Sequence, residues 1–184
     1  RRSSDLLCAY LGVQHLTLVA NATLGLMLAV RQLDLRGEVI TTPFSFVATG
    51  HALLWGGVTP VFVDIDPTTL NIDPERIERA ITPRTTAIMA VHCFGHACDV
   101  VAIEDIARRH GLKVIYDAAH AFGVRLGNGR SVLEYGDLSV ASFHATKVFN
   151  TFEGGAIISR HGDAKQAIDR LTNYGIVDEN TIAT

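Results

Sequence analysis

The chain has 184 residues and a formal net charge of -3, and 48% of its residues are hydrophobic against 19% charged. This length is enough for one domain with a sizeable core, and the composition is globular rather than disordered. The 16 basic residues do not outnumber the 19 acidic ones, which argues against nucleic acid as the main partner. No apolar run approaches the roughly 20 residues that span a bilayer, and the first residues do not resemble a signal peptide, so we expect no membrane partner.

Three cysteines, Cys8, Cys93 and Cys98, cannot all pair within one chain. The spacing of Cys93 and Cys98 is not that of a CxxC redox or zinc motif, so we expect reduced thiols and a cytoplasmic location. The sequence opens without a methionine and closes at Thr184, shortly after a helical pattern. We therefore expect a piece of a longer protein.

Short apolar runs alternate with amphipathic stretches along the chain. In chain order, the first predicted elements are a helix over Leu24–Leu33, strands over Val39–Thr41 and Val61–Val63, a helix over Pro74–Ile81, a strand over Ala87–Val91 and a helix over Val100–His110. They are followed by a strand over Val114–Tyr116, a surface excursion or hairpin over Gly123–Gly136, strands over Leu138–Ser142 and Ala156–Ser159, and a helix over Asp163–Tyr174. Asp73 is a candidate N-cap, and Gly111 follows the third helix as a stop signal. This alternation predicts a largely parallel sheet covered on both faces, with ligands bound outside the carboxyl ends of its strands.

A lysine follows the predicted strand Leu138–Ser142 at a distance of five residues, within the run Ala141–Lys147. A lysine held in such a turn can form a Schiff base with an aldehyde. Most loop lysines are instead solvated surface charges, so Lys147 taken alone leaves both interpretations open.

Asp117 directly follows the predicted strand Val114–Tyr116 and precedes two small residues, Ala118 and Ala119. A carboxylate in this place leaves room for a flat ligand. It can keep a pyridinium nitrogen protonated, since opposite charges at close range favour both ionised groups. An aspartate that caps the following turn explains the same residue without a ligand.

Small and hydroxylated residues stand directly before the first predicted helix, in the run Asn21–Gly25. Such a helix start exposes backbone N–H groups, which suit an anion. Simple N-capping by Asn21 or Thr23 explains the same residues, and the two roles are compatible.

Two phenylalanines follow the strand Val39–Thr41, in the turn Thr42–Val47. We expect Phe44 in the core, because aromatic side chains after strands usually pack there. Phe46 is the better candidate for offset stacking on a planar ring, which contributes about 0.5–1.5 kcal/mol beyond area burial.

In this order and spacing, the four segments resemble the sugar aminotransferase family of fold-type-I pyridoxal-phosphate (PLP) enzymes, the DegT/DnrJ/StrS type. The resemblance runs from Tyr10–Val13 to Asn173–Gly175, and its most specific segments are Asp117–His120, Ser142–Lys147 and Glu153–Gly155. It implies an α/β fold, a three-layer αβα sandwich with a mostly parallel sheet. The whole chain, 1–184, would then be the large PLP-binding domain, incomplete at both ends and without the family's small C-terminal domain.

The resemblance implies that Lys147 and Asp117 are the catalytic residues. Lys147 matches the family's Schiff-base lysine, and Asp117 matches the carboxylate that pairs with the pyridinium nitrogen of PLP. His120 matches a position close to the phenolic oxygen of the ring.

The remaining implied contacts hold the phosphate and the ring face of PLP. The Ser142 hydroxyl, Thr23 and the Leu24 amide match the family's phosphate contacts, and Phe46 matches the aromatic residue stacked on the ring. The run Asn21–Thr23 departs from the family's more common Ser-Gly-Thr, which makes this loop less permissive.

The implied reaction moves an amino group from an amino acid, usually L-glutamate, to a nucleotide-linked keto-deoxysugar in a homodimer with shared active sites. One alternative is a PLP-dependent sugar dehydratase, and another is a non-catalytic domain that retains the fold. Dehydratase relatives carry histidine at the Schiff-base position, so Lys147 disfavours the first. The joint presence of Lys147, Asp117 and Ser142 disfavours the second.

Other titratable residues lie near the predicted sheet edge. His92, His96 and Cys98 match no metal-ligand spacing, so we expect no metal site. Buried packing is expected for Cys93 and Cys98, which disfavours a cysteine-based enzyme. His92 follows a strand and is a candidate for lining the cleft, and His144 is a second candidate outside the catalytic set.

Overall fold

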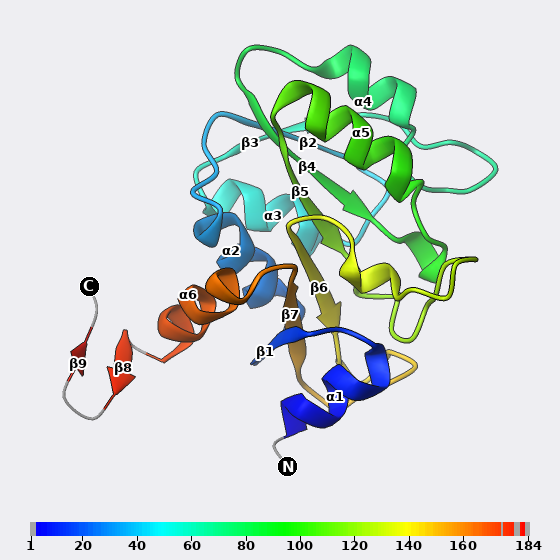
Figure 1. Ribbon diagram of the computed structural model, residues 1–184. Coiled ribbons are helices and arrows are strands. Elements are labelled where there is room, and N and C mark those ends of the chain that lie inside the picture. The colour runs from blue at the N-terminus through cyan, green and yellow to red at the C-terminus, as the bar shows by residue number, and fades with distance from the viewer. Residues whose placement is uncertain (1–2, 174, 179–180, 183–184) are drawn as a thin grey trace.

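A seven-stranded sheet with the order β1-β7-β6-β5-β4-β2-β3 forms the centre of the molecule (Figure 1). The computed structural model describes residues 3–173, 175–178 and 181–182. The strands are β1 (His15–Val19), β2 (Glu38–Thr41), β3 (Thr59–Phe62), β4 (Thr85–Val91), β5 (Lys113–Asp117), β6 (Leu138–Ser142) and β7 (Gly155–Ser159). Strands β2 to β6 pair in parallel, whereas β7 runs antiparallel to both of its neighbours, β1 and β6.

Helices cover both faces of this sheet and give it two separate apolar layers. One face carries α2 (Ala22–Gln32), α3 (Val47–Trp55) and α6 (Gly162–Thr172), and the other carries α1 (Ser3–Leu11), α4 (Pro74–Ala80) and α5 (Val100–His110). Two short 3₁₀ turns, η1 (Cys93–Gly95) and η2 (Val132–Glu134), and a small ribbon of β8 (Ile176–Asp178) and β9 (Thr181–Ile182) complete the described elements. The predicted αβα sandwich with a mostly parallel sheet is confirmed.

Strand β5 shows why the central strands read as continuous apolar runs. Val114 and Tyr116 pack into the layer under α4 and α5, whereas Ile115 packs into the layer under α2 and α3. Successive side chains of a strand point to opposite faces, so the middle of a strand covered on both sides is apolar at consecutive positions.

Local signals fix the ends of the helices on one face. The Asp73 side chain accepts a hydrogen bond from Glu75 N at 2.9 Å, which confirms the predicted N-cap of α4. Helix α5 has the predicted bounds, and it ends at Gly111, whose φ of 66° is the left-handed conformation that glycine adopts most easily.

Several boundaries differ from the predictions, and seven of the described elements were not predicted. The strand expected at Val61–Val63 lies at Thr59–Phe62, and the last helix ends at Thr172, while Tyr174 lies outside the described residues. The unpredicted elements are α1, β1 and α3 in the main layers, together with the short elements η1, η2, β8 and β9. Within the predicted hairpin, Arg125 bridges to Ser131. Among the described residues, no helix has the length and apolar character needed to cross a bilayer.

Candidate active site

A cavity of about 720 Å³ opens at the carboxyl ends of three neighbouring strands and at the start of α2. Val91, Asp117 and Ser142, which end β4, β5 and β6, lie side by side in the sheet and line this cavity. Its other lining residues are Asn21, Ala22, Thr23, Leu26, Phe46, Ala48, Ala119, His120, His144, Thr146, Lys147 and Glu153. The fold thus brings together the four segments singled out in the sequence.

Asp117 forms the floor of the cavity and is only 5% exposed. Its Oδ2 accepts a hydrogen bond from the Thr49 hydroxyl at 2.7 Å, and its Oδ1 accepts one from Ala119 N at 3.1 Å. Burial raises the pKa of this carboxyl, while these two donors and the charges of His120 and Lys147 act in the opposite direction. A buried carboxylate held by two donors is ready to pair with a cationic ring nitrogen.

His120 is held in one orientation above the site. Its Nδ1 accepts a hydrogen bond from Phe94 N at 3.3 Å, and its ring stacks on the Phe94 ring with centroids 6.0 Å apart. Because Nδ1 is an acceptor, the neutral ring carries its proton on Nε2. Burial lowers the pKa of His120, with the Lys147 charge acting in the same direction, so the neutral form is favoured. His120 therefore presents an N–H donor.

The start of α2 forms one wall of the cavity. Asn21 caps this helix, and its Oδ1 accepts a hydrogen bond from Leu24 N at 2.9 Å. Leu24 lies outside the lining residues, and its amide is engaged by the cap, so its predicted phosphate contact stays a prediction. Ala22 and Thr23 do line the cavity. The helix start packs so closely on β7 that a Cβ at Gly155 would lie 2.9 Å from Ala22 N, which explains the glycine there.

Lys147 lies on the loop between β6 and β7, and aromatic packing anchors this loop. Phe143, at its beginning, is buried and packs edge-to-face with Phe149 at 5.1 Å, and Phe149 stacks on Phe122 at 4.3 Å. The backbone N–H of Lys147 donates to His144 O at 2.9 Å. The lysine side chain lines the same cavity as Asp117.

The two phenylalanines after β2 differ from expectation in one respect. Phe46 lines the cavity and is 75% exposed, so its ring is free to cover a planar ligand. Phe44 is not in the core. It is 41% exposed and makes an edge-to-face contact with Phe94 at 6.3 Å, because the turn after β2 carries it out of the sheet layer.

His92 does not line the cavity, contrary to the prediction. Its ring is fully buried, its Nδ1 accepts a hydrogen bond from Cys98 N at 3.1 Å, and it stacks on Tyr116 at 4.6 Å. Burial lowers the pKa of His92 to about 3. Burial also raises the pKa of Cys98 to about 12 and that of Cys93 above its usual value, so neither thiol is primed for nucleophilic attack.

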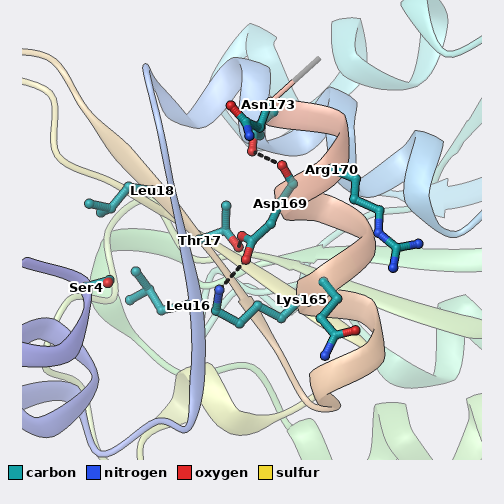
Figure 2. A pocket seen from close by; sticks show the side chains of 10 residues that line it. Ser4, Leu16, Thr17, Leu18, Lys165, Asp169, Arg170 and Asn173 are labelled. Carbon is teal, nitrogen blue, oxygen red and sulfur yellow. Dashed lines mark hydrogen bonds and ion pairs between the residues drawn. The ribbon is translucent and has the colours of Figure 1, made fainter. Parts of the chain in front are cut away.

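A second hollow, of about 800 Å³, lies between α1, β1 and α6 and shares no lining residue with this cavity (Figure 2). The Thr17 hydroxyl donates to Asp169 Oδ1 at 2.5 Å, and Lys165 pairs with Asp169 Oδ2. These polar groups satisfy one another, so they are not available to a ligand. In the described part of the chain, no group of His, Cys, Asp and Glu side chains is placed to hold a metal ion.

Comparison with known proteins places this geometry in a family. The model of the DegT/DnrJ/EryC1/StrS aminotransferase family matches residues 4–183. The chain belongs to this family.

Individual relatives agree with the family assignment. The chain is 62% identical over 176 residues to the dTDP-4-amino-4,6-dideoxy-D-glucose transaminase of Shigella dysenteriae, covering 96% of this chain and 48% of that protein. The solved structure of DesI with its TDP-sugar product matches with a TM-score of 0.90 and 44% identity, covering 94% of this chain and 44% of that one. The ntda protein of Bacillus subtilis, solved with the cofactor PMP, matches with a TM-score of 0.88 and 33% identity over 98% of this chain and 41% of that one. The chain thus spans about half the length of these relatives.

DegT/DnrJ/EryC1/StrS aminotransferases depend on PLP, and the residues of the cavity fit this cofactor. The start of α2 with Thr23, and Ser142 at the end of β6, line the cavity together with the buried Asp117 carboxylate and with Lys147 on the β6–β7 loop. These groups complement a phosphate, a ring nitrogen and an aldehyde, respectively. Six of the seven predicted site residues line the cavity, and their individual roles stay predictions.

Sequence reasoning missed two residues that position this site. Thr49, in the interior of α3, holds Asp117 from 68 positions away in the sequence. Asn71 holds the loop that carries Phe94, because its Oδ1 accepts from Cys93 N at 2.9 Å and its Nδ2 donates to Ala97 O at 3.0 Å. Neither residue has a sequence signal, since a single Thr or Asn becomes informative only once the fold shows its partner.

Proposed function

We propose that the full-length protein is a PLP-dependent aminotransferase that moves an amino group from L-glutamate to a dTDP-linked keto-deoxysugar. The observation that carries this proposal is the convergence of Lys147, Asp117 and the start of α2 on one cavity. Two relatives support the substrate class, because one is a dTDP-amino-sugar transaminase and another was solved with a TDP-sugar product. In this proposal, residues 1–184 are the large PLP-binding domain, and a small C-terminal domain completes the protein.

Each residue has a distinct task in this proposal. Bound PLP supplies an electron sink for the bond-breaking steps. Asp117 keeps a proton on the ring nitrogen, and Thr49 keeps Asp117 ionised and oriented. The His120 Nε2–H donates to an oxygen on the ring. Lys147 Nζ would take the proton from the donor's α-carbon and deliver it to the aldehyde carbon of the cofactor, which would keep the amino group. With the keto sugar bound, the same amine would carry out the reverse transfer and deliver a proton to the carbon that receives the amino group.

We also propose a homodimer in which each active site is closed by the partner. Exposed apolar side chains occur in the segments that contribute to the cavity: Phe46, which lines it, is 75% exposed, and Val148 and Phe152, on the loop that carries Lys147, are 88% and 82% exposed. Such a cluster is typical of an interaction surface rather than of free surface. Cys8, Cys93 and Cys98 are unpaired thiols, which suits the reducing cytoplasm.

The proposed function is tested with the full-length protein, PLP, L-glutamate and a panel of nucleotide-linked keto-deoxysugars. We expect release of 2-oxoglutarate with a dTDP-linked keto sugar and none when Lys147 is replaced by alanine. If wild-type protein loaded with PLP releases no 2-oxoglutarate with any member of the panel, the proposal is wrong.

A further inference from the structure

Two polar side chains in the cavity, His144 and Glu153, have no part in the predicted cofactor contacts. They lie on the β6–β7 loop that also carries Lys147. Backbone hydrogen bonds of 2.9 and 2.8 Å continue the antiparallel pairing past the strand ends and set His144 opposite Glu153. Because alternate residues of an extended segment share a face, His144 lies on the same face as Ser142, toward the cavity.

The His144 ring is oriented so that it presents a donor to Glu153. Its Nδ1 accepts a hydrogen bond from Thr146 N at 3.3 Å and lies 2.9 Å from the Thr146 hydroxyl, which is able to donate to it as well. Because a backbone N–H only donates, the proton of the neutral ring is assigned to Nε2. The distance from Nε2 to Glu153 Oε1 is 3.8 Å, which is longer than a direct hydrogen bond. A hydroxyl group placed beside both atoms could accept from Nε2 and donate to Oε1.

This pair lies at the rim of the cavity, above the cofactor residues. The side chains of His144 and Glu153 are 48% and 67% exposed, whereas Asp117 on the floor is 5% exposed. A ligand that contacts the rim pair is therefore a second molecule that enters over the cofactor.

The charge of Glu153 limits which chemical group can lie beside this pair. A carboxylate group of an amino donor such as L-glutamate would be repelled if it lay next to Glu153. An uncharged hydroxyl of a sugar ring both accepts and donates, and so it matches a donor and an acceptor side by side.

We propose that His144 and Glu153 form a specificity subsite that binds one ring hydroxyl of the nucleotide-linked sugar. This inference rests on the proposed function, and it assigns the pair to the sugar rather than to the amino donor or the cofactor.

The test uses the full-length holoenzyme and a thermodynamic cycle with two changes. One change is the His144→Leu substitution, and the other is the removal of one hydroxyl group from the sugar substrate in a series of deoxy analogues. We expect His144→Leu and Glu153→Ala each to raise the KM for the sugar about tenfold, with a smaller effect on the KM for L-glutamate. With the one analogue that lacks the bound hydroxyl, the penalty of each substitution should fall below about twofold. His144→Gln, which keeps an N–H donor, should recover most of the loss.

His161, exposed at the start of α6 and outside the cavity lining, provides the matched control substitution His161→Leu. The subsite is overturned if no analogue reduces the penalty, or if the KM for L-glutamate rises as much as that for the sugar. If His144→Leu does not fold, the same cycle with Glu153→Ala decides the question. Wild-type enzyme that accepts no keto sugar would refute the proposed function itself. An active enzyme in which the substitution and the missing sugar hydroxyl have independent effects would refute only the subsite.

Discussion

Removal of the Thr49 hydroxyl tests how much its hydrogen bond to Asp117 contributes to PLP binding. Thr49 is fully buried and its hydroxyl lies 2.7 Å from Asp117 Oδ2, so Thr49→Val removes one donor from a buried carboxylate at nearly constant volume. A hydrogen bond to a charged group contributes about 1.5–3 kcal/mol, which corresponds to about 10- to 100-fold in a binding constant. We expect Thr49→Val to weaken PLP binding by that factor.

The assay is a titration of the full-length apoprotein with PLP at several pH values, in which binding is monitored by absorbance. Burial already raises the pKa of Asp117, and loss of the Thr49 donor should raise it further. A carboxyl group whose pKa is raised in the folded state stabilises the fold at pH values below its ordinary pKa. This stabilisation is lost as the pH rises through the pKa of the folded state. Between acidic and neutral pH, the Thr49→Val apoprotein should therefore lose more stability than the wild type does. On acidification, its affinity for PLP should begin to fall at a higher pH than that of the wild type.

Thr49→Ser is the matched control because it keeps the hydroxyl and removes only a methyl group. We expect it to bind PLP within a few-fold of the wild type. A Thr49→Val affinity within twofold of wild type, or equal losses in the Val and Ser variants, would refute the role of this hydrogen bond.

Four further outcomes are expected. Gly155→Ala should cost about 1–3 kcal/mol of stability by thermal denaturation, because its Cβ would meet Ala22 N at 2.9 Å, and an unchanged melting temperature would contradict this packing. Asn21→Asp should keep the helix cap yet weaken PLP binding through repulsion of the phosphate, whereas Asn21→Ala should lose about 1 kcal/mol of stability. Because the pKa of His92 is lowered to about 3, apoprotein stability should fall as pH drops from about 6.5 toward 3, and His92→Asn, which cannot take up a proton, should show a flatter decline. The full-length protein should be a dimer by light scattering, and an active monomer would rule out shared sites.

The strand–helix alternation was sufficient to predict the layers of the sheet, because strands covered on both faces are mostly apolar. Helix α5 carries its own signals, an aspartate cap and a left-handed Gly111, and its bounds were predicted correctly. Helix α3 lacks such signals. Its N-cap residue, Phe46, makes no side-chain capping bond, and Gly50 interrupts its interior, so the segment reads as a loop.

The site was predictable to the extent that its residues stand at strand ends and at a helix start. Lys147, Asp117 and Thr23 occupy such places, and parallel topology brings strand ends together. The same rule was wrong for His92, because the loop after β4 folds back and the Cys98 N–H donates a hydrogen bond to the imidazole inside the core. Strand-end position predicts proximity to a cleft but not the direction of a side chain.

The most direct test of the site is to identify the lysine that bonds to the cofactor. Full-length protein incubated with PLP is reduced with borohydride, digested and mapped by mass spectrometry. We predict that the cofactor mass is attached to Lys147 and is absent after Lys147→Ala. Attachment to another lysine in the wild-type protein, or retention of the adduct in the variant, would contradict the assignment of this cavity as the PLP site.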